Sequence, residues 1–561
     1  MENNPQTNKK KLEEHSHEEL VELVKKLKRR KKYGLMFEAK SEKVVERCKT
    51  ELPILVEHID KAIVDDDSKN TNVIIQGDNY HALSVLNYTH SGRIDLIYID
   101  PPYNTGNKDF MYNDRYVEKD DNFKHSQWLS FMAKRLELSK NLLTKKGAIF
   151  ISIDDNEYAQ LKLLCDSVFG EENFINTVCV KMSHLSGVKM SHIDKKLPKL
   201  KEYLLIYAKN KNALELLPVY EDADIIKSFD RYKSFIIKDT KRPDDISKWK
   251  VVPLKKAMLD LGFDSTDQDQ ITDFYMNYSN QIFRTARNKS EMFLGLPNDT
   301  LFRKIETATG LKKLAYRREE VVFVSSKMSE SDSKLKQPLG DIWLDIGINN
   351  LHNEGGIDFK NGKKPLRLIE RIIGMTPSKN SLILDFFAGS GTTGEATLNM
   401  NELDGGDRQF ILVTNNENKI AEQITYKRIK NTIDNKQHPI SLRYFETAFV
   451  AKNNVSDDTR RELVRRSVEM ICVRENTFTK KYDNKDYKIY TNGKISTGVI
   501  FDLDSIEEFK EKIEKLKLPA RIYVFSLSND TYESDFADLE VRHKLCAIPE
   551  SILEVYRKLF I

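Results

Sequence analysis

One short stretch carries the residue types needed for chemistry on a flat ligand that bears an amine. The stretch is Asp100-Pro101-Pro102-Tyr103-Asn104-Thr105-Gly106, and it follows the largely apolar run 94–99. An apolar run closed by Pro-Pro predicts a buried strand of a parallel sheet that ends in a tight turn. Ligands bind at the carboxyl edge of such sheets. There, Asp100 and a backbone carbonyl of the Pro101–Pro102 turn could accept two amine N–H groups while the Tyr103 ring stacks on the heterocycle. The same residues could also simply end a strand, since Asp and Pro are common there.

A second motif lies far downstream. Residues 385–394, Asp385-Phe-Phe387-Ala-Gly389-Ser-Gly391-Thr-Thr-Gly394, predict a strand, a glycine turn and a helix start. The glycines also satisfy G-x-G-x-x-G, so a nicotinamide dehydrogenase is an alternative, and so is a purely structural role in helix–strand packing. Asp385 favours S-adenosylmethionine over NAD, because a carboxylate could meet an ammonium but would repel a pyrophosphate.

Strands and helices alternate on both sides of a long interruption. Between about 72 and 209, apolar strands such as 147–153 are separated by helical patterns such as 127–138, and the alternation resumes from 365 to 413. This predicts an α/β fold, a doubly wound Rossmann-like sheet whose two halves are separated in sequence. The intervening residues mix aromatic and basic side chains. Such a mixture suits nucleic-acid contact, although an ordinary amphipathic surface explains it nearly as well.

We therefore divide the chain into five parts. They are a helical basic N-terminal segment (1–70), the first half of the core (71–210), an inserted domain (211–340), the second half of the core (341–445) and an α/β C-terminal domain (446–561). The basic cluster at 25–32 is expected to be a solvated helix face or a contact to a phosphate backbone.

Composition narrows the class of protein. The chain has 561 residues, too many for one core, and 31% of them are charged. No apolar run approaches the ~20 residues of a membrane span, and the N-terminus has no apolar signal core. The five cysteines are scattered, which is typical of reduced packing residues and makes zinc ligation unlikely. We expect a cytoplasmic protein, and the net charge of +4 permits a nucleic-acid partner without requiring one.

Together, these motifs resemble the β-class amino-methyltransferases of DNA and, more closely, the Mod subunits of type III restriction–modification systems. The resemblance extends over nearly the whole chain apart from 211–340. It is carried by the two motifs above and by the segments 30–35, 76–83, 125–129, 152–157, 362–365 and 548–556.

The resemblance implies direct transfer of a methyl group from S-adenosylmethionine to adenine N6 of a flipped-out base, without a metal. It implies catalytic roles for Asp100, Pro101, Pro102 and Tyr103, and it assigns Asp78, Asp385, Phe387, Gly389 and Gly391 to the cofactor. Thr414 stands where many relatives have a ribose-binding acid, so Glu417 is chosen for that role, with a helix-terminal charge as its alternative.

Two further expectations concern neighbouring side chains. The acids Asp154, Asp155 and Glu157 stand at a helix start, where caps are commoner than metal or acid–base clusters. His125 and Trp128 are expected to be local packing residues, with lining of the base pocket as the alternative.

The resemblance also implies partners. They are double-stranded DNA, contacted by a target-recognition domain at 211–340, a second copy of the chain, and a separate ATP-dependent Res subunit, because no G-x-x-x-x-G-K-[ST] phosphate loop is present. Asp at the first position of the motif favours adenine. The alternatives are cytosine N4 as the target, or a DNA-recognition subunit whose methylation is dispensable.

Overall fold

The computed structural model describes two compact units of the chain. Unit 1 comprises Met1–Leu217 and Asp341–Ile561, and unit 2 comprises Pro218–Gly340. The residues that are described are 37, 40–65, 70–105, 124–183, 197–222, 231–297, 301–306, 312–327, 336–346, 351–357, 363–436, 439–452, 457–527 and 530–560. The basic cluster expected at 25–32 lies outside them.

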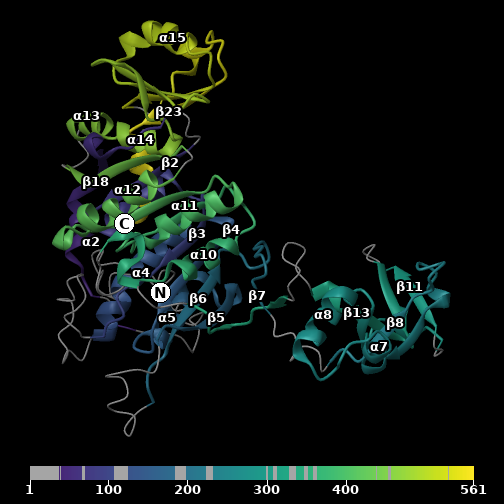
Figure 1. Cartoon of the computed structure of the whole chain (residues 1–561). Coiled ribbons are helices and arrows are strands. Elements are labelled where there is room, and N and C mark those ends of the chain that lie inside the picture. Colours follow the sequence, from purple (N-terminus) through teal and green to yellow (C-terminus); the bar gives the residue numbers. More distant parts are fainter. Residues whose placement is uncertain are drawn as a thin grey trace, which may run out of the picture. The chain divides into compact units, whose positions relative to one another are not determined.

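A ten-stranded sheet forms the centre of unit 1 (Figure 1). Its strand order is β1 (Glu51–Glu57), β18 (Ser441–Ala451), β2 (Thr71–Gln76), β17 (Gln409–Thr414), β16 (Leu382–Asp385), β3 (Ile94–Ile99), β4 (Leu143–Ile153), β6 (Lys201–Ala208), β5 (Phe174–Lys181) and β15 (Ile342–Trp343). The strands from β18 to β4 are parallel to their neighbours, whereas β1 and β6 are antiparallel to theirs. Strands β16 and β17 therefore lie between β2 and β3, so the two sequence halves interleave in one sheet.

Helices cover both faces of this sheet. On β17, Ile411 and Val413 belong to one buried cluster, and Phe410 and Leu412 belong to another. Successive side chains of a strand point to opposite faces, so these clusters are the two faces of the sheet. The first face carries α3 (Asn79–Thr89), α4 (Lys124–Leu142) and α5 (Tyr158–Phe169), and the second carries α11 (Thr392–Asp404) and α12 (Lys427–Asp434), with α10 (Leu366–Gly374) against α11. The expected doubly wound α/β sheet is confirmed.

The end of the chain adds a smaller sheet to unit 1. Strands β19 (Thr479–Asp483), β20 (Tyr487–Thr491), β21 (Ser496–Ile500), β22 (Ala520–Phe525) and β23 (His543–Ile548) are hydrogen-bonded in that order. Helix α15 (Ile506–Glu514) packs on this sheet through Phe509 and Ile513. Helices α13 (Asp457–Arg466) and α14 (Val468–Glu475) precede the sheet, and α16 (Glu550–Phe560) follows it and returns to pack against α3. Strand β18 continues to Ala451, past the boundary expected at 446.

Unit 2 contains an antiparallel sheet that was not visible in the sequence. Its order is β11 (Phe302–Glu306), β12 (Lys312–Tyr316), β13 (Glu319–Phe323), β10 (Ile282–Ala286), β8 (Ser234–Ile237) and β9 (Lys250–Pro253). Neighbouring Phe235 and Ile236 belong to different buried clusters, so both faces of this sheet are packed. The unit also contains helices α7 (Leu254–Asp260), α8 (Gln268–Tyr278) and α9 (Glu291–Leu294), and a short ladder of β7 (Tyr220–Asp222) with β14 (Lys336–Pro338).

No helix in the described ranges is both long and apolar enough to cross a membrane. The five cysteines form no disulfide, and Cys48, Cys165 and Cys472 are buried.

Candidate active site

The turn from Asp100 to Asn104 is held by side chains from several elements. The indole Nε1 of Trp128, on α4, donates to the Pro102 carbonyl at 2.7 Å. Asn104 adopts a left-handed conformation, with φ of 56°, and its amide donates to Glu157 Oε1 at 2.6 Å. His125 Nδ1 also lies 2.7 Å from that oxygen. The turn is thus preorganised on both sides of Tyr103.

Two residues outside the expected set contact the expected catalytic pair. Lys364, just before α10, places its Nζ 3.0 Å from Asp100 Oδ1 and 2.9 Å from Glu202 Oε2, a carboxylate on β6. The Lys364 ammonium also donates to the Tyr103 hydroxyl at 2.7 Å, and that hydroxyl donates to Glu202 at 2.9 Å. Tyr103 is only 7% exposed. These four side chains form one buried charged network.

The glycine turn follows β16 and is braced by its own side chains. Asp385 is buried, and its oxygens accept the Phe387 N–H at 3.0 Å and the Thr393 hydroxyl at 2.6 Å. Gly391 is the N-cap of α11 and has φ of 78°, a left-handed conformation that glycine adopts at no steric cost. A Cβ on Gly394 would lie 2.5 Å from Ile429 Cδ1, so this third glycine permits close packing of α11 on its neighbours. Phe387 is buried in the core beside Phe131.

The expected adenine and ribose ligands lie at the ends of the next strands. Asp78 follows β2 and caps α3, where its Oδ1 accepts the Tyr80 N–H at 2.7 Å. Arg135 Nη2 lies 3.4 Å from the same oxygen. Glu417 comes three residues after β17 and is partly buried. Its neighbour Asn416 carries a buried Oδ1 that accepts no hydrogen bond within the described chain.

The two motifs meet at one edge of the sheet. Strands β3 and β16 are adjacent and parallel, with Leu384 opposite Ile97, so both turns leave the same carboxyl edge. Burial raises the pKa of Asp385 to about 7, and the charge of Asp100 contributes to that rise. Burial likewise raises the pKa of Asp100 to about 6. The charge of Lys364 opposes this rise in the pKa, and the charge of Glu202 adds to it. The expectation that these distant segments share one site agrees with the strand order.

The residues present suit a cationic ligand. The charge of Asp100 disfavours the charge of buried Asp385, so a sulfonium and an ammonium would relieve the two carboxylates, whereas a pyrophosphate would be repelled. The orphaned Asn416 Oδ1 is an additional acceptor at the same edge. S-adenosylmethionine has those positive groups and hydroxyl donors for such an acceptor, whereas NAD does not match the charge.

Among the acids at the start of α5, Asp154 caps the turn that leads into the helix, because its Oδ1 accepts the Asn156 N–H at 2.9 Å, whereas Glu157 does not act as a cap. Glu157 occupies the N-cap of α5 but makes no side-chain capping hydrogen bond, because it holds Asn104 and His125 instead. Asp154 accepts from Asn156 and from Lys199, and Asp155 accepts from Lys201. No group of three or more metal-ligating side chains was found among the residues that are described.

Three contributors to the site were not identified from the sequence. They are Lys364, Glu202 and Asn416. Lys364 belongs to the segment 362–365, Gly-Lys-Lys-Pro, which contributes to the resemblance, but the resemblance assigned no role to this lysine. Glu202 resembles an ordinary strand residue, and nothing local distinguishes it.

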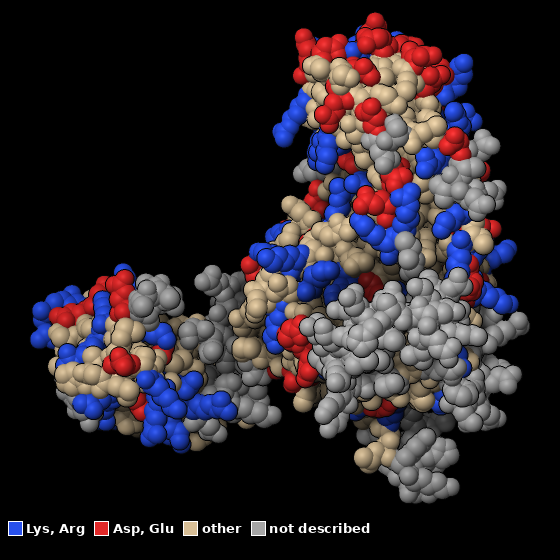
Figure 2. All heavy atoms as spheres, turned by 180° about the vertical axis from the view of Figure 1, so that it is seen from behind, with Lys and Arg blue, Asp and Glu red and all other residues tan. Residues whose placement is uncertain are grey.

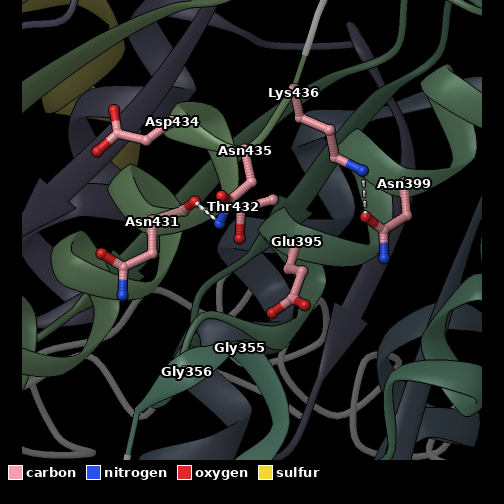
Figure 3. A pocket seen from close by; sticks show the side chains of 9 residues that line it. All are labelled: Gly355, Gly356, Glu395, Asn399, Asn431, Thr432, Asp434, Asn435 and Lys436. Carbon is pink, nitrogen blue, oxygen red and sulfur yellow. Dashed lines mark hydrogen bonds between the residues drawn. The ribbon is translucent and has the colours of Figure 1, made fainter.

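A polar cavity lies elsewhere (Figure 3). It has a volume of about 510 Å³ and is lined by polar side chains of α11 and α12, with Gly355 and Gly356 below them. Lys436 Nζ donates to Asn399 there at 2.7 Å. None of the expected site residues lines this cavity, so the chemistry is assigned to the sheet edge.

The fold and the site define an α/β enzyme that binds its ligands at the carboxyl edge of a doubly wound sheet. A family model described as DNA methylase matches residues 94–425, more than half of the chain. The chain belongs to this DNA methylase family.

Named relatives agree with the family. A probable type III restriction–modification HindVI Mod subunit of Haemophilus influenzae is 35% identical over 408 residues, which cover 67% of this chain and 52% of that one. The EcoPI Mod subunit of Escherichia phage P1 is 30% identical, with coverage of 65% and 61%. The type II methyltransferase M.KpnI of Klebsiella pneumoniae is 32% identical, with coverage of 64% and 84%. The expected resemblance to Mod subunits is confirmed, although the chain spans only about half to three fifths of the two Mod relatives.

Solved structures are more distant in sequence. A DNA modification methylase of Thermus thermophilus, complexed with S-adenosyl-L-methionine, is 14% identical with a TM-score of 0.32, and the match covers 67% of this chain and 99% of that one.

Proposed function

We propose that this protein is an S-adenosylmethionine-dependent DNA methyltransferase that acts on adenine N6. The observation that carries the proposal is the meeting of the Asp100 turn and the Gly389–Gly391 turn at the ends of adjacent parallel strands. Membership of the DNA methylase family supports it. If the protein were a nicotinamide dehydrogenase, calorimetry would show binding of NAD. We expect calorimetry to show binding of S-adenosylmethionine only.

The cofactor would be held by residues at three strand ends, those of β2, β16 and β17. We assign Asp78 to its adenine edge, and Asp385, Phe387, Gly389 and Gly391 to its methionine end and backbone cradle. Glu417 is proposed for the ribose, and Asn416 is added here because of its unused buried oxygen. When bound, S-adenosylmethionine supplies an electrophilic methyl group on a positively charged sulfur.

The target base would be held by the Asp100 turn. An adenine N6 amine is a weak nucleophile because its lone pair is delocalised into the ring. Hydrogen bonds from its N–H groups to Asp100 and a backbone carbonyl would favour a pyramidal nitrogen and stabilise developing positive charge. Trp128 already donates to the Pro102 carbonyl, so the Pro101 carbonyl is the proposed acceptor. Tyr103 would stack on the flipped base.

Substitution of Asp100 by alanine tests this assignment. We expect Asp100→Ala to lower methyl transfer at least ~100-fold, because the amine loses its charged acceptor, while DNA binding stays within a few-fold of wild type. Incorporation of labelled methyl groups into DNA and gel-shift binding measure the two quantities. Unchanged methyl transfer would refute the role of Asp100. If the methylation is instead dispensable for the protein's biological role, DNA should remain protected from restriction in the Asp100→Ala variant.

The choice of adenine rests on Asp100, because cytosine-N4 enzymes of this class more often carry Ser at that position. Mass analysis of nucleosides from treated DNA decides between the two. We expect 6-methyladenine, and 4-methylcytosine without it would establish the alternative.

Unit 2 is proposed as the target-recognition domain. Basic side chains gather on its β11–β12–β13 strands, where Arg303, Lys304, Lys312, Lys313, Arg317 and Arg318 lie, and Figure 2 shows Lys and Arg grouped on the surface of this unit. Exposed acids gather instead around α7 and α8, at Asp260, Asp264, Asp267, Asp269 and Asp273. This division of charge favours the β11–β13 side for contact with phosphates.

We further propose that the chain acts in the cytoplasm as the modification subunit of a type III system, as a homodimer with a Res partner. The two Mod relatives support this assignment. Co-purification of the native protein from its host, followed by mass determination of the complex, tests both partners. Recovery of a lone monomer with full methyl transfer would favour an independent methyltransferase.

A further inference from the structure

Lys364 contacts both side chains that are proposed to handle the base, and Glu202 contacts Lys364 and Tyr103. The Lys364 ammonium touches Asp100, Tyr103 and Glu202, and the Glu202 carboxylate closes the network through the Tyr103 hydroxyl. The Lys364 side chain is 9% exposed, Asp100 is 18% exposed and Glu202 is 23% exposed. Charges with so little exposure to water are stabilised by pairing, so each of the three groups affects the others.

The contacts of Lys364 leave only part of the Asp100 and Tyr103 surfaces available to a base. Lys364 makes its ion pair through Oδ1 of Asp100, so Oδ2 is the carboxylate oxygen that we assign to the base. The Lys364 Nζ stands 4.7 Å from the centroid of the Tyr103 ring, at the hydroxyl end of the ring. The second carboxylate oxygen and a face of the Tyr103 ring are therefore the surfaces that would receive a base.

We propose that Lys364 and Glu202 are positioning residues: Lys364 keeps Asp100 ionised, and the two residues together hold the Tyr103 ring fixed for the target base. This inference rests on the proposed methyltransferase function. Lys364 supplies the positive charge that holds the carboxylate in its anionic form. Glu202 anchors the ammonium and the phenol, and it opposes Lys364 electrostatically at Asp100.

The two residues act on Asp100 in opposite directions. The charge of Lys364 lowers the pKa of Asp100, and the charge of Glu202 raises it. Burial lowers the pKa of Lys364, but the two carboxylates outweigh burial and hold it above its ordinary value. Burial raises the pKa of Glu202, but Lys364 outweighs burial and holds it below its ordinary value. Both partners thus stay charged while Asp100 titrates.

Of the titratable groups that face Asp100, all but Lys364 and Glu202 are left unchanged in the test. From all the elements around it, the groups are Lys364 before α10, Glu202 on β6, Tyr103 in the turn, Tyr98 on β3 and Asp385 at the end of β16.

The experiment compares pH profiles of single-turnover methyl transfer for wild type, Lys364→Met, Lys364→Arg and Glu202→Gln, between about pH 5 and pH 9. The substrate is bulk bacterial genomic DNA from a methylation-deficient host. For Lys364→Met we expect the acid limb to move to higher pH by at least about one unit, which is about a tenfold loss below the midpoint. For Glu202→Gln we expect a move to lower pH. Lys364→Arg keeps the charge and should restore the wild-type midpoint.

The control is Lys430→Met, which removes a surface lysine on α12 that pairs with Asp434. It should leave the profile unchanged. Midpoints that stay fixed, or that move in the same direction in Lys364→Met and Glu202→Gln, would overturn the inference. If Lys364→Met fails to fold, shown by loss of S-adenosylmethionine binding in calorimetry, the direction of the Glu202→Gln shift decides. Failure of the proposed function is a different result, in which wild type methylates no DNA at any pH.

Discussion

At the scale of single residues, the site is dominated by carboxyl groups that are costly to bury. Asp385 is 3% exposed, and within the described part of the chain its carboxylate accepts hydrogen bonds from the neutral Phe387 N–H and Thr393 hydroxyl. Its ordinary pKa of 3.8 rises to about 7, chiefly through burial. A group of this kind is retained at the expense of stability, which is a common property of functional sites.

The sign of that cost leads to a prediction. Because the folded state binds the proton of Asp385 more tightly, stability falls as pH rises from about 4 to about 7 and stays lower above that. Asp385→Asn removes the charge and should raise the melting temperature at about pH 8, where the cost is at most roughly 4 kcal/mol, with a smaller gain at about pH 5. Differential scanning fluorimetry at both pH values measures this, and calorimetry should show weaker S-adenosylmethionine binding.

A matched control substitution, at Asp404, should change the melting temperature in the opposite direction. Arg408 holds the pKa of Asp404 below its ordinary value, so Asp404→Asn should lower the melting temperature at the higher pH. Equal effects of the two substitutions at both pH values would contradict the role of burial at Asp385.

At the scale of elements, the hairpin of β12 and β13 has loop residues that disfavour the backbone conformation they adopt. Its two-residue loop consists of Arg317 and Arg318, whose φ values are 52° and 65°. Such loops favour Asn-Gly, because non-glycine residues with positive φ are strained by roughly 1 kcal/mol each. Both arginines are exposed, and the Arg317 guanidinium lies 5.2 Å from the Tyr316 ring centroid. Arg318 Nε donates to the Leu296 carbonyl, and its other N–H groups and the Arg317 guanidinium at this strained tip suit contact with a phosphate backbone.

Replacing the tip by the preferred residues separates stability from binding. Arg317→Asn with Arg318→Gly should stabilise unit 2, because the strain is removed, yet weaken DNA binding about tenfold and reduce its dependence on salt. Fluorescence anisotropy with duplex DNA measures the affinity between roughly 50 and 200 mM salt, a range over which affinity carried by phosphate contacts falls steeply. Thermal unfolding measures the stability.

The control removes two exposed lysines of α7, by Lys255→Asn with Lys256→Asn, and so deletes the same charge from the acidic side of the unit. Equal losses of affinity in the two double variants would show that only net charge matters.

At the scale of the whole molecule, unit 2 enters and leaves the chain at one place. Strands β7 and β14 pair antiparallel, with Asp222 opposite Lys336. Chain ends that lie this close allow the intervening segment to be excised without stretching the rest. The core of unit 1 is built from other residues, so it should not depend on that segment.

Excision of unit 2 therefore tests whether unit 1 binds the cofactor and unit 2 recognises the target sequence. A variant lacking 223–335, with Asp222 joined to Lys336 through Asn-Gly, should bind S-adenosylmethionine with an affinity close to wild type and lose site-specific DNA methylation. Calorimetry and sequencing of methylated positions measure these outcomes. Loss of cofactor binding in a folded variant would show that unit 2 contributes to the cofactor site. Retained methylation at the same sites would move target recognition into unit 1.

The sequence by itself determined the residues for chemistry and the type of sheet that presents them. Strand ends, proline turns and glycine turns are local signals, so the Asp100 and Gly389–Gly391 motifs and most of the alternating elements could be predicted directly. Strand β5, the interleaving of β16 and β17 between β2 and β3, and the sheet of unit 2 could not, because pairing partners and register depend on contacts far apart in the chain.

Only the tertiary structure decided which groups surround the chemistry. Glu202 and Lys364 are separated from Tyr103 by 99 and 261 positions in sequence, yet both contact its hydroxyl. Trp128 donates to the Pro102 carbonyl of the proline turn, and Glu157 contacts Asn104 and does not cap its helix. A buried charge must be paired by whatever the fold brings beside it, and no local pattern specifies that partner.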